Sequence, residues 1–153
     1  MLELPHTAVG AAIATKIPNP FLAIPLAFLS HFLLDLIPHW NPSLYRETKK
    51  YGKPTKKSTW FVIGDVILSL GVGLFLASRV WPDLSRALII LFTCFAAVVL
   101  DVVEGFYFFL GIRPEFLRRL IEFQHRFQGR TPLIPGLIIQ GAIVALALIV
   151  FFL

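Results

Sequence analysis

Four histidines and a set of carboxylates lie within or beside the most apolar stretches of this 153-residue chain. His31 and Asp35 are one helical turn apart, and His39 follows one turn later. Asp101 and Glu104 have the i, i+3 spacing that places both carboxylates on one face of a helix. An ionisable side chain inside a membrane span costs on the order of 3 kcal/mol to insert, so such residues indicate a functional site.

Imidazole and carboxylate groups at helical spacing suit zinc or a similar divalent ion, because each ligand must aim a lone pair from a rigid scaffold. Eight residues are candidate ligands: His6, His31, Asp35, His39, Asp65, Asp101, Glu104 and His125. They exceed the needs of one tetrahedral ion, so the set predicts two or three ions, with a water as nucleophile beside a phosphoryl group. One carboxylate, that of Asp35, Asp65 or Glu104, would be left as the general base.

The composition places these residues in a membrane. The chain is 57% hydrophobic and only 15% charged, whereas soluble globular domains contain about 25% charged residues. Several apolar stretches reach the roughly 20 residues that cross a hydrocarbon core about 30 Å thick. The sequence therefore predicts an all-α integral membrane protein, folded as a single domain over residues 1–153.

Five apolar helices and one amphipathic helix are expected. The apolar helices cover residues 5–17, 21–37, 60–80, 86–110 and 132–153. The first is too short to span a membrane alone, and we expect it to pack as one arm of a hairpin, because Pro18 and Pro20 separate it from the second. Residues 114–128 repeat apolar side chains at helical spacing opposite charged ones, which is typical of a helix lying in the membrane interface.

A basic loop over residues 41–58 sets the expected topology. Its six positive side chains are Arg46, Lys49, Lys50, Lys53, Lys56 and Lys57. The positive-inside rule puts this loop and the N-terminus in the cytoplasm and the C-terminus outside the plasma (inner) membrane of a prokaryote. All eight candidate ligands then fall in one layer near the cytoplasmic boundary. Besides the lipid bilayer, the loop would attract an anionic lipid or a phosphorylated substrate.

Nucleic acid is not an expected partner, because the basic residues lack the repeated aromatic and basic pattern of strand-binding grooves. Each candidate ligand also has a structural interpretation. Asp65 could hydrogen-bond within its own helix, and His31 with Asp35 could form an interhelical pair. His6 could start a helix, and His125 could be exposed at the interface. The shared depth of all eight residues favours a site.

Two blocks of the sequence resemble conserved blocks of a prokaryotic inner-membrane family of metal-dependent hydrolases. They are His-Thr-Ala-Val-Gly at residues 6–10 and Ser-His-Phe-Leu-Leu-Asp-Leu-Ile-Pro-His-Trp at residues 30–40. That family is distantly similar to zinc-dependent phospholipase C and P1 nuclease, which are all-helical enzymes with trinuclear zinc sites. A third block, beginning at His125, lacks the second histidine of the family's His-Arg-Gly-x-Thr-His-Ser pattern. The resemblance implies a zinc-dependent hydrolase.

Three functions are compatible with the sequence. The first is a metal-dependent hydrolase of phosphoesters, carried by a lipid or a lipid-linked phosphate, at the cytoplasmic face. The second is a transporter or channel for metal ions or protons, which would distribute polar residues through the full depth of the membrane. The outer halves of the predicted spans are nearly free of ionisable groups, which disfavours it. The third is a membrane module that a metal ion staples without catalysis.

Overall fold

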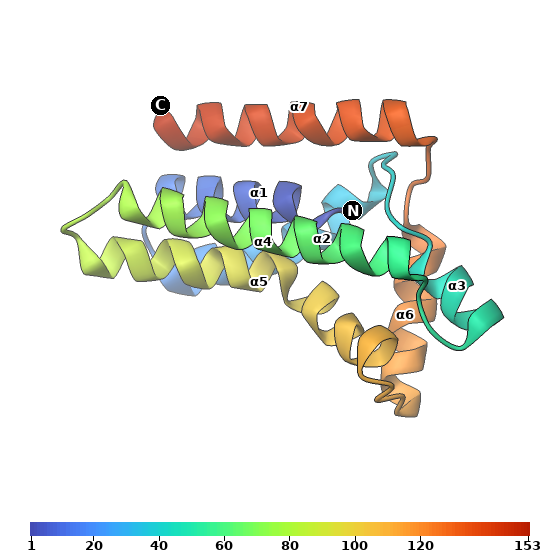
Figure 1. The fold of residues 1–153 in the computed structure, drawn as a ribbon. Coiled ribbons are helices and arrows are strands. Elements are labelled where there is room, and N and C mark those ends of the chain that lie inside the picture. The colour runs from blue at the N-terminus through green and yellow to red at the C-terminus, as the bar shows by residue number, and fades with distance from the viewer.

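The computed structural model describes residues 1–153 as an assembly of seven α-helices without a β-strand (Figure 1). The helices are α1 (Glu3–Lys16), α2 (Pro20–Leu36), α3 (Leu44–Tyr51), α4 (Lys56–Ser78), α5 (Leu84–Phe109), α6 (Glu115–Phe127) and α7 (Leu133–Phe152). The predicted all-α class is confirmed. Six of the seven helices correspond to predicted ones, with ends that differ by a few residues.

Helix α3 was not predicted, because it lies within the stretch that the sequence indicates as a polar loop. It has eight residues, too few and too polar to show an apolar repeat, and it ends at Gly52, whose φ of 78° is left-handed. Glu47 of α3 accepts hydrogen bonds from the Thr55 backbone nitrogen and the Ser58 hydroxyl, each at 2.7 Å. These bonds fold the basic segment back onto the start of α4.

Three helices, α4, α5 and α7, are long and apolar enough to cross a membrane. Helix α2 is apolar but has 17 residues, and α1 has 14. At 1.5 Å per residue α1 covers about 20 Å, well short of a hydrocarbon core about 30 Å thick. The expected bundle of five membrane helices is therefore supported for three of them, and the orientation in the membrane stays a prediction.

Helix α1 is the centre of the assembly. It packs against α5, α7, α4 and α2, and in Figure 1 it lies between α7 and the other long helices. Its buried side chains are mostly alanines, which allow neighbouring backbones to approach closely. A Cβ atom added to Gly10 would lie 2.8 Å from the Thr93 carbonyl oxygen of α5. Such close packing fixes the position of His6, one turn from the beginning of α1.

Helix α6 crosses one end of the bundle (Figure 1). It is amphipathic, as predicted: Leu117 and Ile121 are buried against Phe108 of α5, while Arg118 and Arg119 pair with acidic side chains on the exposed face. Its location at a membrane interface stays a prediction. In the structure α6 closes the end of the bundle at which α1 begins and α2 ends.

The segment after α6 is joined to the end of α2 by backbone hydrogen bonds. The Gly129 nitrogen donates to the Asp35 carbonyl at 2.8 Å, and its own carbonyl accepts from the His39 nitrogen at 3.3 Å. The Thr131 nitrogen then donates to the His39 carbonyl at 3.0 Å. A Cβ atom at Gly129 would lie 2.6 Å from the Leu36 carbonyl oxygen, so the contact requires glycine.

Replacing Gly10 by alanine tests the central packing of α1. We expect Gly10→Ala to lower the free energy of unfolding by about 1–3 kcal/mol, because the new methyl group would overlap the α5 backbone. Gly71→Ala is the matched control, since nothing lies within 4 Å of its Cβ position, and it should be neutral or stabilising by up to about 1 kcal/mol. Thermal unfolding in detergent measures both. Equal melting temperatures for the two variants would contradict this packing.

Candidate metal centre

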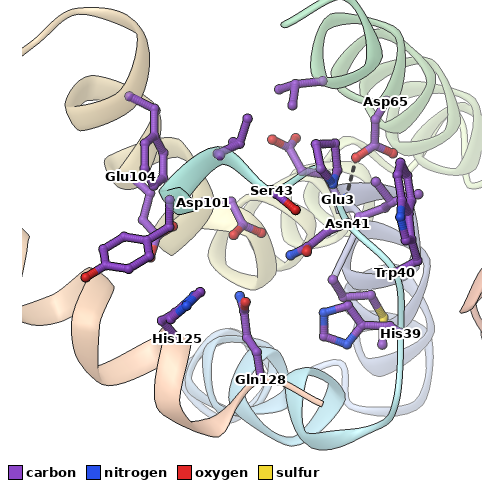
Figure 2. Close-up of a pocket in the computed structure, with 18 of the residues that line it drawn as sticks. Glu3, His39, Trp40, Asn41, Ser43, Asp65, Asp101, Glu104, His125 and Gln128 are labelled. Atoms are coloured by element: carbon purple, nitrogen blue, oxygen red, sulfur yellow. Dashed lines mark hydrogen bonds between the residues drawn. The ribbon is translucent and has the colours of Figure 1, made fainter. Parts of the chain in front are cut away.

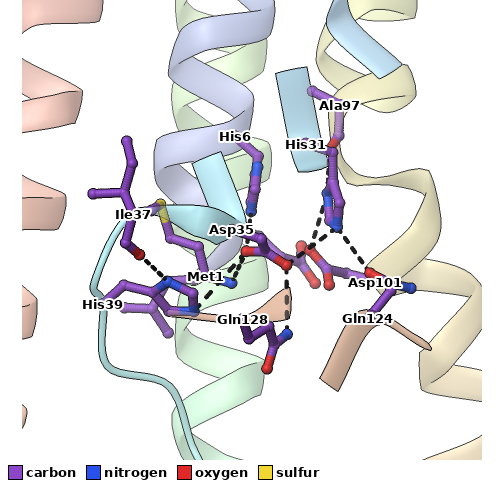
Figure 3. A network of polar contacts seen from close by, with 12 residues as sticks. Met1, His6, His31, Asp35, Ile37, His39, Ala97, Asp101, Gln124 and Gln128 are labelled. Atoms are coloured by element: carbon purple, nitrogen blue, oxygen red, sulfur yellow. Dashed lines mark hydrogen bonds and ion pairs between the residues drawn. The ribbon is translucent and has the colours of Figure 1, made fainter. Parts of the chain in front are cut away.

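Helices α1, α2 and α5 bring His6, His31 and Asp101 together. One ligand atom from each of the three lies within 4.8 Å of the other two, which is close enough to surround one metal ion. Both histidines are fully buried, and their rings stack with centroids 4.3 Å apart and planes 18° from parallel. Figure 3 shows the two rings side by side above the carboxylates.

Asp35, buried at the end of α2, is the point on which three imidazoles converge. The Nε2 atoms of His6, His31 and His39 lie 3.5, 3.6 and 3.9 Å from its carboxylate oxygens. The Met1 nitrogen contacts the same carboxylate (Figure 3). His39 reaches this point although α2 ends at Leu36, because the chain turns back and pairs with the segment after α6.

Hydrogen bonds to backbone carbonyls orient two of the imidazoles. Nδ1 of His39 lies 2.8 Å from the Ile37 carbonyl oxygen, and Nδ1 of His31 lies 2.9 Å from that of Ala97. Donation from Nδ1 leaves the lone pair on Nε2, the usual arrangement of a metal-binding histidine. Burial lowers the pKa of His39 to about 4, so this ring is neutral at pH 7. Both Nε2 lone pairs face Asp35.

Several polar atoms at this centre have no hydrogen-bond partner. Both ring nitrogens of His6 and Oδ2 of Asp101 are buried without a hydrogen-bond partner. Nε2 of His31 faces the Gln124 amide oxygen at 3.2 Å, because the Gln124 amide nitrogen donates to Glu104 at 2.9 Å. Buried polar groups are almost always paired, so the unpaired atoms of His6 and Asp101 are exceptions. A cation resolves this arrangement, so the residues present fit a metal ion.

Two glutamines of α6 belong to the centre, although the sequence did not single them out. Gln124 is buried and links His31 to Glu104, while the Gln128 amide nitrogen lies 3.4 Å from Oδ2 of Asp35. Both are drawn in Figure 3. Their i, i+4 spacing on the amphipathic helix was the available signal, but uncharged glutamine is common on exposed faces. The position of α6 across the bundle brings both glutamines into contact with the centre.

Gln140 of α7 joins three segments at the edge of the centre. Its oxygen accepts from the Leu2 nitrogen at 2.8 Å, and its nitrogen donates to the Trp40 carbonyl at 2.9 Å. These bonds hold the beginning of α1, the chain after α2 and helix α7 together. Gln140 therefore supports the centre without belonging to it.

Asp65 of α4 acts on the beginning of α1. Its carboxylate oxygens accept from the backbone nitrogens of Glu3 and Leu4 at 2.6 and 3.4 Å. Leu2, the residue before α1, provides no side-chain cap, so an aspartate from another helix supplies it. Asp65 lies outside the group of three ligands whose atoms approach within 4.8 Å. Its role as a metal ligand or base stays a prediction.

A cavity of about 650 Å³ adjoins the centre, and its volume is in the range of small-molecule sites. Asp101, Glu104 and His39 line it on the side of the centre, and His125 lies across from the two carboxylates (Figure 2). His125 contacts Tyr45, with ring centroids 4.4 Å apart and planes 44° from parallel, and is likewise outside the group of three ligands. Metal ligation by Glu104, His39 and His125 stays a prediction.

Comparison of the chain with protein-family models, with curated proteins and with solved structures finds no match. The likeness to metal-dependent hydrolases therefore rests on the two sequence blocks at residues 6–10 and 30–40 alone. In the structure these blocks supply His6, His31, Asp35 and His39, which are neighbours.

Replacing Asp65 separates helix capping from metal binding. We expect Asp65→Ala to lower the free energy of unfolding by about 1 kcal/mol, because two backbone N–H groups of α1 lose their acceptor. Its bound metal, measured by mass spectrometry of purified protein, should equal that of the unchanged chain. Loss of metal from Asp65→Ala at unchanged stability would instead make Asp65 a ligand.

Proposed function

We propose that this chain is a membrane-embedded, metal-dependent hydrolase of phosphoesters. The observation that carries the proposal is the group formed by His6, His31 and Asp101, in which the ring nitrogens of His6 and Oδ2 of Asp101 are buried without hydrogen-bond partners beside a cavity of about 650 Å³. Zinc is the metal that suits this combination of imidazole and carboxylate ligands. The remaining carboxylates and His39 would supply ligands for the second or third ion that the sequence predicts.

His6, His31 and Asp101 would hold the metal, with Asp35 beside all of them. A divalent cation supplies Lewis acidity toward a phosphoryl oxygen. Asp35 lies within 3.9 Å of the Nε2 atoms of three imidazoles, and the Gln124 amide contacts both His31 and Glu104. Glu104 lines the cavity near Asp101, so we assign it the role of general base, which takes the proton from the attacking water.

The distribution of polar groups favours hydrolysis over transport. The histidines and acidic side chains of α1, α2, α4 and α5 lie at the end of the bundle that α6 closes. Toward the other end, the space between α1, α4, α5 and α7 is filled by a continuous apolar cluster: Ala11, Ala14, Leu76, Ala77, Ala87, Ile90, Cys94 and Phe151. A transporter needs polar groups along a path across the membrane. This cluster offers none.

The exposed apolar faces of α4, α5 and α7 support a site within a lipid bilayer. The basic segment from Arg46 to Lys57 follows the end of the bundle that carries the site. The positive-inside rule then puts the site at the cytoplasmic face of a prokaryotic inner membrane. A phospholipid or a lipid-linked phosphate is the substrate class that reaches this position and suits a cavity with apolar and basic walls.

Metal analysis tests the assignment of the ligands. Protein purified without chelator should contain at least one divalent ion per chain, and His31→Ala or Asp101→Ala should lose it, because each removes one of three ligands. Glu122→Ala is the control, since that glutamate pairs with Arg118 on the surface of α6. Mass spectrometry of the eluted protein measures the metal. A chain without stoichiometric metal would exclude both the hydrolase and the metal-stapled module.

Turnover separates the hydrolase from a metal-stapled module. The metal-loaded chain should hydrolyse bis-p-nitrophenyl phosphate or a phospholipid, and Glu104→Gln should lower kcat by about 100-fold or more while metal remains bound. Retention of the metal in this variant distinguishes a lost base from a lost ligand. Stoichiometric metal without hydrolysis of either substrate would show the metal to be structural.

A further inference from the structure

Two arginines line the wall of the cavity that carries His125. Arg46 comes from α3 and Arg130 from the segment between α6 and α7. Neither arginine forms an ion pair. The arginine ion pairs of this chain belong to Arg118 and Arg119 on the outer face of α6. Two guanidinium groups on one cavity wall without a carboxylate partner leave their charge uncompensated.

His125 lies between these two charges. Nη2 of Arg130 lies 2.5 Å from Nε2 and 2.8 Å from Nδ1 of His125, and the Tyr45 ring contacts His125 with its plane 44° from parallel. Because a guanidinium group has only donors, His125 accepts a hydrogen bond from Arg130. Neighbouring guanidinium groups repel a metal cation. The surroundings of His125 therefore suit an anion better than the metal ion that the sequence predicts there.

The cavity wall formed by Arg46, Arg130 and His125 is called the basic wall here. The backbone fixes it relative to the metal centre. Arg130 pairs with His39 in a parallel bridge, and the adjacent Thr131 nitrogen donates to the His39 carbonyl. The His39 side chain faces Asp35. Arg130 of the basic wall therefore pairs directly with a residue that contacts the centre. Across the cavity lie Asp101 and Glu104 (Figure 2). An anion on the basic wall would therefore stand beside the metal ligands.

We propose that Arg46, Arg130 and His125 form a binding site for a phosphate group. Guanidinium groups bind phosphate oxygens with two parallel hydrogen bonds, which makes arginine the preferred partner of this anion. The site deepens the proposed hydrolase, because it would hold the phosphate of the substrate. Anion binding itself needs neither metal nor turnover, so it can be tested separately.

The phosphate could be a lipid headgroup or a free anion, and the cavity favours the lipid. One part of its remaining wall is apolar and includes Val62 and Val66 of α4 and Phe109 of α5. The Phe109 side chain is 40% exposed on a helix that is apolar enough to cross a membrane, so this wall is continuous with the surface that lipid covers. A phosphate monoester on an acyl chain would contact both walls.

The test is calorimetric titration of the full chain in detergent, after removal of metal with chelator. The probes are inorganic phosphate and dihexanoyl phosphatidic acid. We expect saturable binding of both, tighter for phosphatidic acid. Arg46→Ala and Arg130→Ala should each weaken binding by about 10-fold or more, because a hydrogen bond to a charged group contributes about 1.5–3 kcal/mol. Arg130→Lys should be intermediate, since lysine lacks the two-pronged donor.

Arg86→Ala is the matched control, because Arg86 is exposed at the beginning of α5, at the opposite end of the bundle. The affinity of this variant for both probes should be unchanged. Circular dichroism establishes that each variant is folded, and exposed Arg46 offers a variant that disturbs no packing. Equal affinities for the two probes would assign the site to free phosphate. Absence of saturable binding, or unchanged affinity in both Arg46→Ala and Arg130→Ala, would overturn the phosphate site. Binding without hydrolysis would leave this site intact and contradict only the hydrolase.

Discussion

The structure depends on one constraint, which is the pairing of buried lone pairs at the end of α2. Three imidazoles converge on the carboxylate of Asp35, and Asp101 faces them from α5. The Met1 nitrogen contacts Asp35, but both ring nitrogens of His6 and Oδ2 of Asp101 stay buried without a partner, which is costly unless a further cation is present. Every helix that approaches this point contributes either a ligand or a group that orients one. A metal ion would join α1, α2 and α5 at one end of the bundle.

The other features of the fold hold these groups at the same height. Alanines and Gly10 let α1 lie against its neighbours, and Asp65 caps the beginning of that helix. Helix α6 closes the end of the bundle with Gln124 directed at His31. The result is a cavity with metal ligands on one side, arginines on another and apolar side chains toward lipid. Such a cavity combines what a phosphorylated lipid would require.

Much of this arrangement could be predicted from spacing and depth. His31 and Asp35 share a helical face, and the hairpin of α1 and α2 brings His6 to the same level. The structure assembles these residues with Asp101, as equal depth requires. Contacts between distant segments could not be predicted. Nothing in the sequence shows that Asp65 accepts from the α1 backbone, that Gln124 is buried, or that Arg130 pairs with His39. Helix α3 was not predicted because eight mostly polar residues are too few to show an apolar repeat.

The central claim is that a divalent metal binds between His6, His31 and Asp101. Anomalous diffraction from crystals of the chain purified without chelator, recorded on both sides of the zinc absorption edge, tests it directly. We expect an anomalous peak about 2.0–2.2 Å from a nitrogen of each histidine and an oxygen of Asp101. A map without a peak at this position, or with its only peak beside His125, would contradict it.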